Sequence, residues 1–288
     1  MLSTARRVGR LPVVPRPEVD ELLSSWLRRT AAFYGAKPNA LLAQLETSTT
    51  DTLAFDWAAS PDDVAKVALA LGTTRSDVIK RSFIGIPTSA LMFIETGTVG
   101  RTCPPCFAEF TKRGMQGVVL LHWKLAVASR CGRCGNSLRG DRTMARHRLT
   151  GWQPSAEMNE RRDDVINIVR INMYDPVTMA VVERLFQAVA TPIRWPVSSH
   201  RDARCRSIGN GPALMWRHPA VQAVVSRRAT PLCRRQANFA SWPEAEQIIA
   251  AACVHQLATA PAQLWVELKR LGLIKSGDTT LARHLFRP

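Results

Sequence analysis

Four of the seven cysteines stand in two Cys-x-x-Cys pairs, Cys103/Cys106 and Cys131/Cys134, with twenty-four residues between the pairs. Two such turns can present four thiolates about 2.3 Å from one Zn²⁺, which completes the tetrahedral shell of a closed structural site. Prolines stiffen the first turn and glycines let the second close. The spacing therefore predicts one structural zinc ion with no open coordination position. A disulfide pair, a redox-active Cys-x-x-Cys and unbound thiols are the alternatives.

No motif nominates a catalytic site. The chain has no Walker-type loop, no Gly-x-Ser-x-Gly turn and no His-Glu-x-x-His helix motif. Two adjacent acid pairs, Asp62/Asp63 and Asp163/Asp164, are present. Neighbouring residues on a helix point about 100° apart, so neither pair forms a shared metal clamp. We therefore expect a protein that is not an enzyme.

The charge predicts a polyanionic partner. The chain holds 39 Lys and Arg residues against 23 Asp and Glu residues, a net charge of +16, which is typical of nucleic-acid-binding proteins. Half of this excess lies in residues 101–150. A basic surface with no bound partner is the alternative. The predicted contacts to double-stranded DNA are Arg75, Lys80, Arg81, Arg101, Arg130, Arg133, Arg139, Arg142, Arg146 and Arg148.

The sequence favours a reducing compartment without a membrane partner. No apolar run reaches the eighteen or so residues that a membrane span needs, and the basic N-terminus lacks the apolar core of a signal peptide. Cys205, Cys233 and Cys253 have no partner spacing. We expect a cytoplasmic, nucleoid-associated protein.

The elements that must position these residues are mostly helical. After a flexible basic arm over residues 1–16, apolar spacing predicts helices over 17–34 and 38–45 in a helical region, residues 17–100. Ser60 and Pro61 begin a helix that Gly72 ends, and Thr73 or Thr74 begins another over residues 75–83. This pattern is typical of a helix-turn-helix unit. Its outward residues suit DNA, although a plain αα-corner is the alternative.

A mainly α fold with a small zinc ribbon follows as the predicted architecture. Residues 101–150 form the ribbon, with strands or a strand-turn over residues 118–127 that cover the metal. His122 is expected to be a packed or surface residue, because four cysteines already fill the site. Residues 153–164 read as a linker, and residues 165–288 as a helical C-terminal domain. Helices over 243–257 and 261–271 form a second, weaker helix-turn-helix candidate.

Three motifs occur in an order that resembles the TniQ family of transposition proteins. Residues 15–31, P-R-P-E-V-D-E-L-L-S-S-W-L-R-R-T-A, resemble the family's P-x-P-x-x-x-E-x-x-x-S-W-L-x-R opening. Residues 101–106, R-T-C-P-P-C, resemble its R-x-C-P-x-C, and residues 122–125, H-W-K-L, resemble its x-W-x-L step. The likeness covers about residues 11–140. Family members commonly carry Cys-x-x-His at the second knuckle, where this chain has Cys-x-x-Cys and no later pair.

The resemblance implies a non-catalytic accessory protein of DNA transposition. Such proteins help to select or mark the target site beside a transposase and an AAA+ ATPase, and some attach to an RNA-guided CRISPR effector. Two alternatives stay open. One is a bridging adaptor that binds an RNA-guided or ATPase partner without autonomous DNA binding, and the other is a zinc-dependent transcription regulator.

Overall fold

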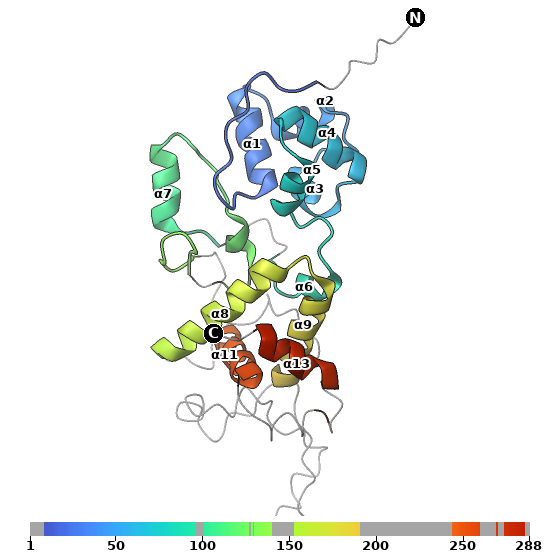
Figure 1. The fold of residues 1–288 in the computed structure, drawn as a ribbon. Helices are drawn as coiled ribbons and strands as arrows, with labels where there is room; N and C mark the ends of the chain where they lie inside the picture. Colours follow the sequence, from blue (N-terminus) through green and yellow to red (C-terminus); the bar gives the residue numbers. More distant parts are fainter. Residues whose placement is uncertain are drawn as a thin grey trace, which may run out of the picture. The chain divides into compact units, whose positions relative to one another are not determined.

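Helices dominate the computed structural model (Figure 1), which describes residues 9–95, 101–126, 128, 130–139, 153–190, 244–259, 269 and 274–285. In these ranges no named strand forms, and the only β pairing consists of isolated antiparallel bridges. The predicted mainly α class is confirmed. The elements are α1 (Leu23–Phe33), α2 (Pro38–Gln44), α3 (Thr52–Ala58), α4 (Pro61–Leu71), α5 (Arg75–Lys80), α6 (Thr88–Leu91), α7 (Pro104–Lys112), the 3₁₀ helix η1 (Leu121–Lys124), α8 (Ala156–Asn172), α9 (Pro176–Ala190), α11 (Glu244–Thr259) and α13 (Ser276–Leu285).

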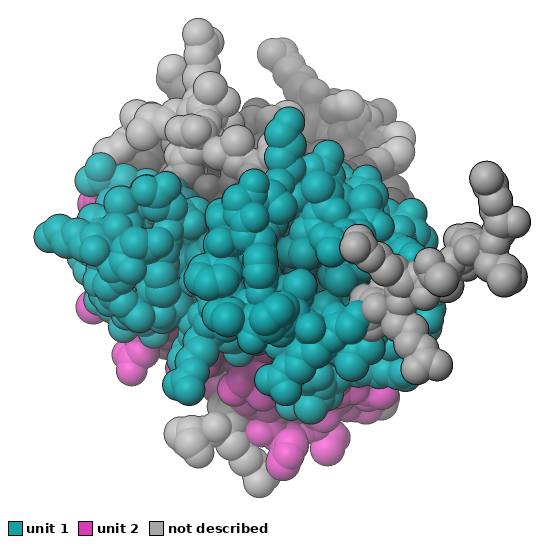
Figure 2. All heavy atoms as spheres, turned by 90° about the horizontal axis from the view of Figure 1, so that it is seen from above, with its two compact units in different colours: residues 1–86, 96–124, 128–141 teal, residues 87–95, 125–127, 142–288 magenta. Residues whose placement is uncertain are grey.

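The chain divides into two compact units, which Figure 2 colours separately. Unit 1 comprises Met1–Ile86, Thr96–Lys124 and Ala128–Asp141, and unit 2 comprises Pro87–Glu95, Leu125–Val127 and Arg142–Pro288. This division differs from the predicted boundaries of 17–100, 101–150 and 165–288. We call residues 101–124 and 128–139, which carry the four cysteines, the cysteine segment. It shares a unit with the N-terminal helices, because the backbone of residues 20–22, just before α1, bonds to residues 119–121.

Helix α1 begins at Leu23, six residues later than the apolar spacing predicts. Asp20 has a φ of 64°, a left-handed conformation that a helix cannot contain, and Val19 is 87% exposed instead of buried. Backbone bonds to another segment explain the change: Leu22 N donates to Val119 O at 2.9 Å, and Leu121 N donates to Asp20 O at 2.7 Å.

The two helices predicted on either side of Gly72 form with the predicted caps. Ser60 caps α4 and Thr74 caps α5, each in a reciprocal bond with the acid three residues on. Gly72 ends α4 with a φ of 64°, a conformation that glycine adopts without a Cβ penalty. A Cβ there would lie 2.6 Å from Nε of Arg10. Helix α5 ends at Lys80, short of the predicted residue 83.

The prediction of a flexible arm over residues 1–16 is wrong for residues 9–16, while residues 1–8 lie outside the described chain. Leu11 N donates to Ala70 O at 2.9 Å, and the Trp26 indole N–H donates to Pro15 O at 2.7 Å. Leu11 and Val14 pack against the core of unit 1. Their apolar side chains hold this segment against α1 and α4.

The core of unit 1 includes two helices that periodicity did not predict. Helix α3 buries Phe55 and Asp56, and α7 follows the first cysteine turn and buries Phe110. The strands or strand-turn predicted over residues 118–127 do not form in the described residues 118–126, which contain η1 with single bridges on either side, Glu21↔Leu120 and Ile94↔Leu125. The β-branched and leucine side chains of this stretch contribute to the buried interior and do not belong to a β-ladder.

Unit 2 packs α11 against α8 and α9, with α6 against α9 and α13 against both α9 and α11. The predicted linker over residues 153–164 is wrong. Ser155 caps α8 by accepting from Met158 N at 3.2 Å, and Met158 and Arg162 are almost fully buried. The Arg162 guanidinium donates to Asn159 Oδ1 at 2.8 Å. The polar side chains of this sequence therefore find hydrogen-bond partners within the helix. The predicted helix 261–271 lies almost wholly outside the described residues.

Candidate metal centre and its clasp

The first cysteine pair is built by the start of helix α7. Cys103 is the extended residue before the helix, prolines occupy its first positions, and Phe107 N donates to Cys103 O at 2.8 Å. Proline fits the first turn because no N–H is needed there. One turn later, Cys106 is brought back beside Cys103, as the sequence predicts.

The second cysteine pair is a tight turn. Cys131 N donates to Asn136 O, and Gly135 N donates to Cys131 O, both at 2.8 Å. Gly135 has a φ of 74°, so this glycine supplies the conformation that closes the turn. A single bridge, Arg130↔Ser137, lies outside it.

The four sulfur atoms lie within 4.8 Å of one another. Sγ of Cys103 lies 3.3 Å from that of Cys134, and Sγ of Cys106 lies 3.4 Å from Cys134 and 3.7 Å from Cys131. Tetrahedral Zn²⁺ with bonds of about 2.3 Å requires sulfurs about 3.8 Å apart. This donor set fits one metal ion. The distances are unlike the S–S bond of about 2.05 Å in a disulfide, and the cysteines are free.

The pKa values of the cysteine thiols are shifted in different directions. Burial raises the pKa of the Cys103 thiol to about 11 and also raises the pKa of Cys106. Burial works in the same direction on Cys131, but hydrogen bonds led by the Trp123 indole N–H outweigh it and lower the pKa of Cys131 to about 6. Holding four thiolates together, three of them buried, costs free energy unless a cation neutralises their charge. A divalent metal ion supplies that charge.

His122 connects the second turn to the segment before α1. Its Nδ1 pairs with the Asp20 carboxylate, and its Nε2 lies 3.1 Å from the donating Gly132 N–H and 3.6 Å from Cys131 Sγ. Since the Gly132 N–H points at Nε2, Nδ1 carries the ring proton and donates it to Asp20. His122 is buried beside the cluster of sulfurs, in keeping with the expectation of a packed histidine.

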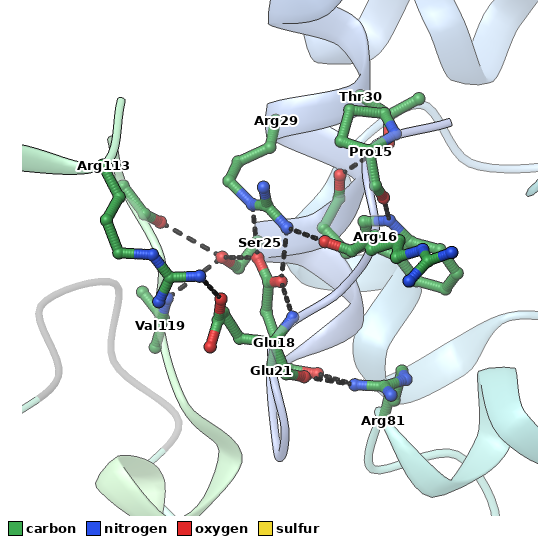
Figure 3. Close-up of polar contacts among 12 residues, drawn as sticks. Pro15, Arg16, Glu18, Glu21, Ser25, Arg29, Thr30, Arg81, Arg113 and Val119 are labelled. Carbon is green, nitrogen blue, oxygen red and sulfur yellow. Dashed lines mark hydrogen bonds and ion pairs between the residues drawn. The ribbon is translucent and has the colours of Figure 1, made fainter. Parts of the chain in front are cut away.

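Glu21 is the centre of a second polar cluster, drawn in Figure 3. Its carboxylate is fully buried and accepts from Ser25 Oγ at 2.9 Å, Arg29 Nη2 at 2.7 Å and Glu18 N at 2.9 Å. Ser25 in turn joins the loop before η1, through Gly117 O at 3.1 Å and Val119 N at 3.0 Å (Figure 3). We call Glu21, Ser25 and Arg29 the Glu21 cluster.

The Glu21 cluster was not among the predicted site residues, although the N-terminal motif contains all three of its members. In the helix predicted over residues 17–34, Ser25 and Arg29 lie four and eight residues after Glu21, a spacing that puts all three on one face. This spacing was the available signal. The structure shows that the motif joins α1 to the cysteine segment.

Two of the predicted DNA contacts near the cysteines are engaged within the fold. Arg133 pairs with Glu18 at 3.2 Å and Glu109 at 2.6 Å, and its guanidinium lies 4.7 Å from the Phe110 ring centroid. Arg101 is only 6% exposed and donates to Ala128 O. Both side chains therefore stabilise the cysteine segment.

The other predicted contacts are divided between the surface and the interior. Arg81 donates to Glu18 O at 2.9 Å, and its guanidinium lies 5.7 Å from the Trp26 ring centroid. Exposed residues are Arg75, Lys80, Arg130 and Arg139. Arg142, Arg146 and Arg148 lie outside the described residues. The assignment of these side chains to DNA stays a prediction.

The adjacent acid pairs diverge, as helix geometry predicts. Asp62 pairs with Lys66 at 2.8 Å, whereas Asp63 accepts from Ser48 N at 2.8 Å. In α8, Asp163 pairs with the preceding arginine and Asp164 with His255. Neither pair brings two carboxylates to one point.

The fold and the cysteine cluster of unit 1 define a helical domain with four cysteines close enough to hold one metal ion. Residues 12–134 match the model of the TniQ family, so this part of the chain is a TniQ domain. The match confirms the resemblance carried by the three motifs. No curated protein and no solved structure matches the chain. Among the described helices, none has the length and apolar character needed to cross a bilayer.

Proposed function

We propose that this protein is a non-catalytic accessory protein of DNA transposition, which helps to select or mark the target site and recruits the transposition machinery to it. The TniQ domain carries this proposal: residues 12–134 match that family, and the Glu21 cluster and the four cysteines lie in the same unit. The cluster of sulfurs holds one structural Zn²⁺. The partners are a transposase, an AAA+ ATPase and, in an RNA-guided system, a CRISPR effector.

Direct binding to double-stranded DNA is the first form of this function. The net charge of +16 supports it, because a strongly basic chain binds phosphates regardless of sequence. Arg130 and Arg139 are exposed on the cysteine segment, and Arg75 and Lys80 are exposed on α5. The exposure of these four side chains supports contacts with a phosphate backbone.

A bridging adaptor without autonomous DNA binding is the second form. The observation in its favour is that Arg81, Arg101 and Arg133 are held by groups of the fold itself. A guanidinium that already has partners would have to lose them in order to bind a phosphate.

Fluorescence anisotropy with random duplex DNA across a salt series distinguishes these forms. For the zinc-loaded full chain we expect tight binding with log affinity falling linearly against log salt. The double variant Arg130→Ala/Arg139→Ala should weaken binding and lower the slope by about 2. Lys37→Ala/Lys112→Ala removes the same charge from other exposed positions and serves as the control. No binding at low salt would favour the bridging adaptor, and metal-dependent nicking by the purified chain would contradict the non-catalytic assignment.

A further inference from the structure

A groove in unit 1 lies between four parts of the TniQ domain. Its walls are the segment before α1, the outer face of α1, helix α7 and the loop that follows α7, and its volume is about 1270 Å³. Small-molecule sites typically measure roughly 300–1,000 Å³. The groove is therefore large enough for several residues of a bound chain.

Apolar groups are exposed in this groove. Phe33 on α1 is 57% exposed and Phe107 on α7 is 44% exposed, and both line it together with Ala32 and Met115. Exposed aromatic rings facing a shared concave surface are typical of sites that receive an apolar anchor residue. Both rings lie on helices whose opposite faces are held in the core.

The charge of the lining favours an acidic partner. Four arginines, Arg16, Arg28, Arg29 and Arg113, line the groove against a single glutamate, Glu18. Among the described residues neither Arg16 nor Arg28 makes an ion pair, and the buried Nε of Arg28 has no hydrogen-bond partner. The exposed guanidinium of Arg16 can pair with a carboxylate of a bound chain.

The remaining arginines argue against a nucleic acid in this groove. Arg29 is bound to the Glu21 carboxylate, and Arg113 is bound to Glu18 at 2.7 Å (Figure 3) and to Glu109 at 3.4 Å. A run of phosphates would meet these carboxylates and would have to displace them. A peptide with one apolar anchor and a few carboxylates requires only the unpaired cations and the exposed rings.

We propose that this groove is a docking site for a short acidic peptide segment of a partner protein, anchored by an aromatic or branched apolar side chain between Phe33 and Phe107. The site deepens the proposed function, on which it rests for the kind of partner, by giving the accessory protein a contact separate from its exposed basic residues. Recruitment would then depend on the groove, and DNA affinity on the surface arginines.

Selection from a phage-displayed library of short random peptides tests the proposal with the zinc-loaded full chain. We expect enrichment of sequences with Asp or Glu flanking an aromatic or branched apolar residue. Synthetic fluorescein-labelled copies should bind Phe33→Ser and Phe107→Ser about tenfold more weakly or worse. Ala32→Glu, which places a carboxylate in the groove, should also abolish binding.

Matched controls separate the groove from general surface changes. Leu69→Ser removes an apolar side chain that is 54% exposed on α4, and Ala40→Glu adds a carboxylate on α2. Both should bind the selected peptides like the parent chain. Duplex-DNA anisotropy should be unchanged by the groove substitutions. Absence of duplex binding by the parent chain would count against the direct DNA-binding form of the proposed function and not against the groove.

Four outcomes would overturn the proposal. The library could yield no acidic, apolar-anchored peptides, or the selected peptides could bind the groove variants as well as the parent chain. Oligothymidine binding that depends on Phe33 and Phe107 would assign the groove to single-stranded nucleic acid. A change from dimer to monomer on Phe33→Ser, measured by sedimentation, would assign it to a second copy of the chain.

Discussion

The imidazole of His122 joins the Asp20 carboxylate on one side to the backbone N–H of Gly132 on the other. Asp20 belongs to the left-handed turn before α1, and Gly132 lies inside the second cysteine turn. One side chain therefore fixes the second cysteine turn against the N-terminal motif. Groups that orient metal ligands in this way contribute to metal affinity as well as to stability.

Replacing His122 should weaken both the fold and the metal site. His122→Ala leaves the Asp20 carboxylate and the Gly132 N–H without their buried partner, at a cost of about 1–3 kcal/mol in the free energy of unfolding. Urea unfolding and the rate of zinc release to a chelator measure the two effects. His284→Ala, at an exposed position on α13, is the control and should match the parent chain. Equal zinc-release rates in the two variants would contradict the orienting role of His122.

Cys131→Ser should abolish stoichiometric zinc binding. The substitution removes one of four thiolates, and a structural site that loses a ligand loses much of the free energy that folds it. Elemental analysis of the purified chain should give one zinc per parent chain. Cys253→Ser removes a thiol in α11 that is no part of the cluster and should keep that zinc. A Cys131→Ser protein with one zinc per chain would remove the four-cysteine assignment.

Arg81→Ala should destabilise unit 1 before it affects any DNA contact. The change removes the hydrogen bonds from the guanidinium to Glu18 O and Glu21 O and its contact with the Trp26 ring. The expected loss is about 1–3 kcal/mol. Lys80→Ala, one residue away and exposed, should lie within about 0.5 kcal/mol of the parent chain. Denaturant unfolding compares the two, and an unchanged midpoint for Arg81→Ala would show that its internal contacts contribute nothing.

Asp56 should make the stability of unit 1 depend on pH. Burial, opposed by hydrogen bonds from Ser24 and by the charges of Arg28 and Lys124, raises the pKa of Asp56 from 3.8 to about 7. Between these two values the native state holds a proton that the unfolded chain has lost, so the free energy of unfolding falls as pH rises from about 4 to about 7. The total change is on the order of 4 kcal/mol at most.

Asp56→Asn removes the titrating group and keeps the oxygen that accepts from Ser24 N at 2.9 Å. The difference in unfolding free energy between the parent chain and this variant should therefore move in favour of the variant as pH rises through the window. Urea unfolding at a series of pH values measures it. Asp62→Asn removes an equal charge from an exposed site and controls for net charge. A difference that stays constant with pH would contradict the prediction.

The sequence alone determined the features that depend on local interactions. The caps Ser60 and Thr74 and the stop at Gly72 work within one helical turn, so residue type and spacing are sufficient to place them. The cysteine pairs are also local turns, and their spacing predicted the cluster of four sulfurs.

Only the tertiary structure decided what the charged side chains do. Arg81 and Arg133 are basic residues beside predicted motifs, but their partners include Glu18, which lies 63 and 115 residues away in the chain. The late start of α1 has the same cause, because backbone pairing with residues 119–121 competes with helix formation there. In α8, buried Arg162 is satisfied by neighbours that a polarity pattern assigns to a linker. Sequence spacing reports which residues can interact locally, whereas the choice between an internal partner and solvent depends on contacts that only folding brings together.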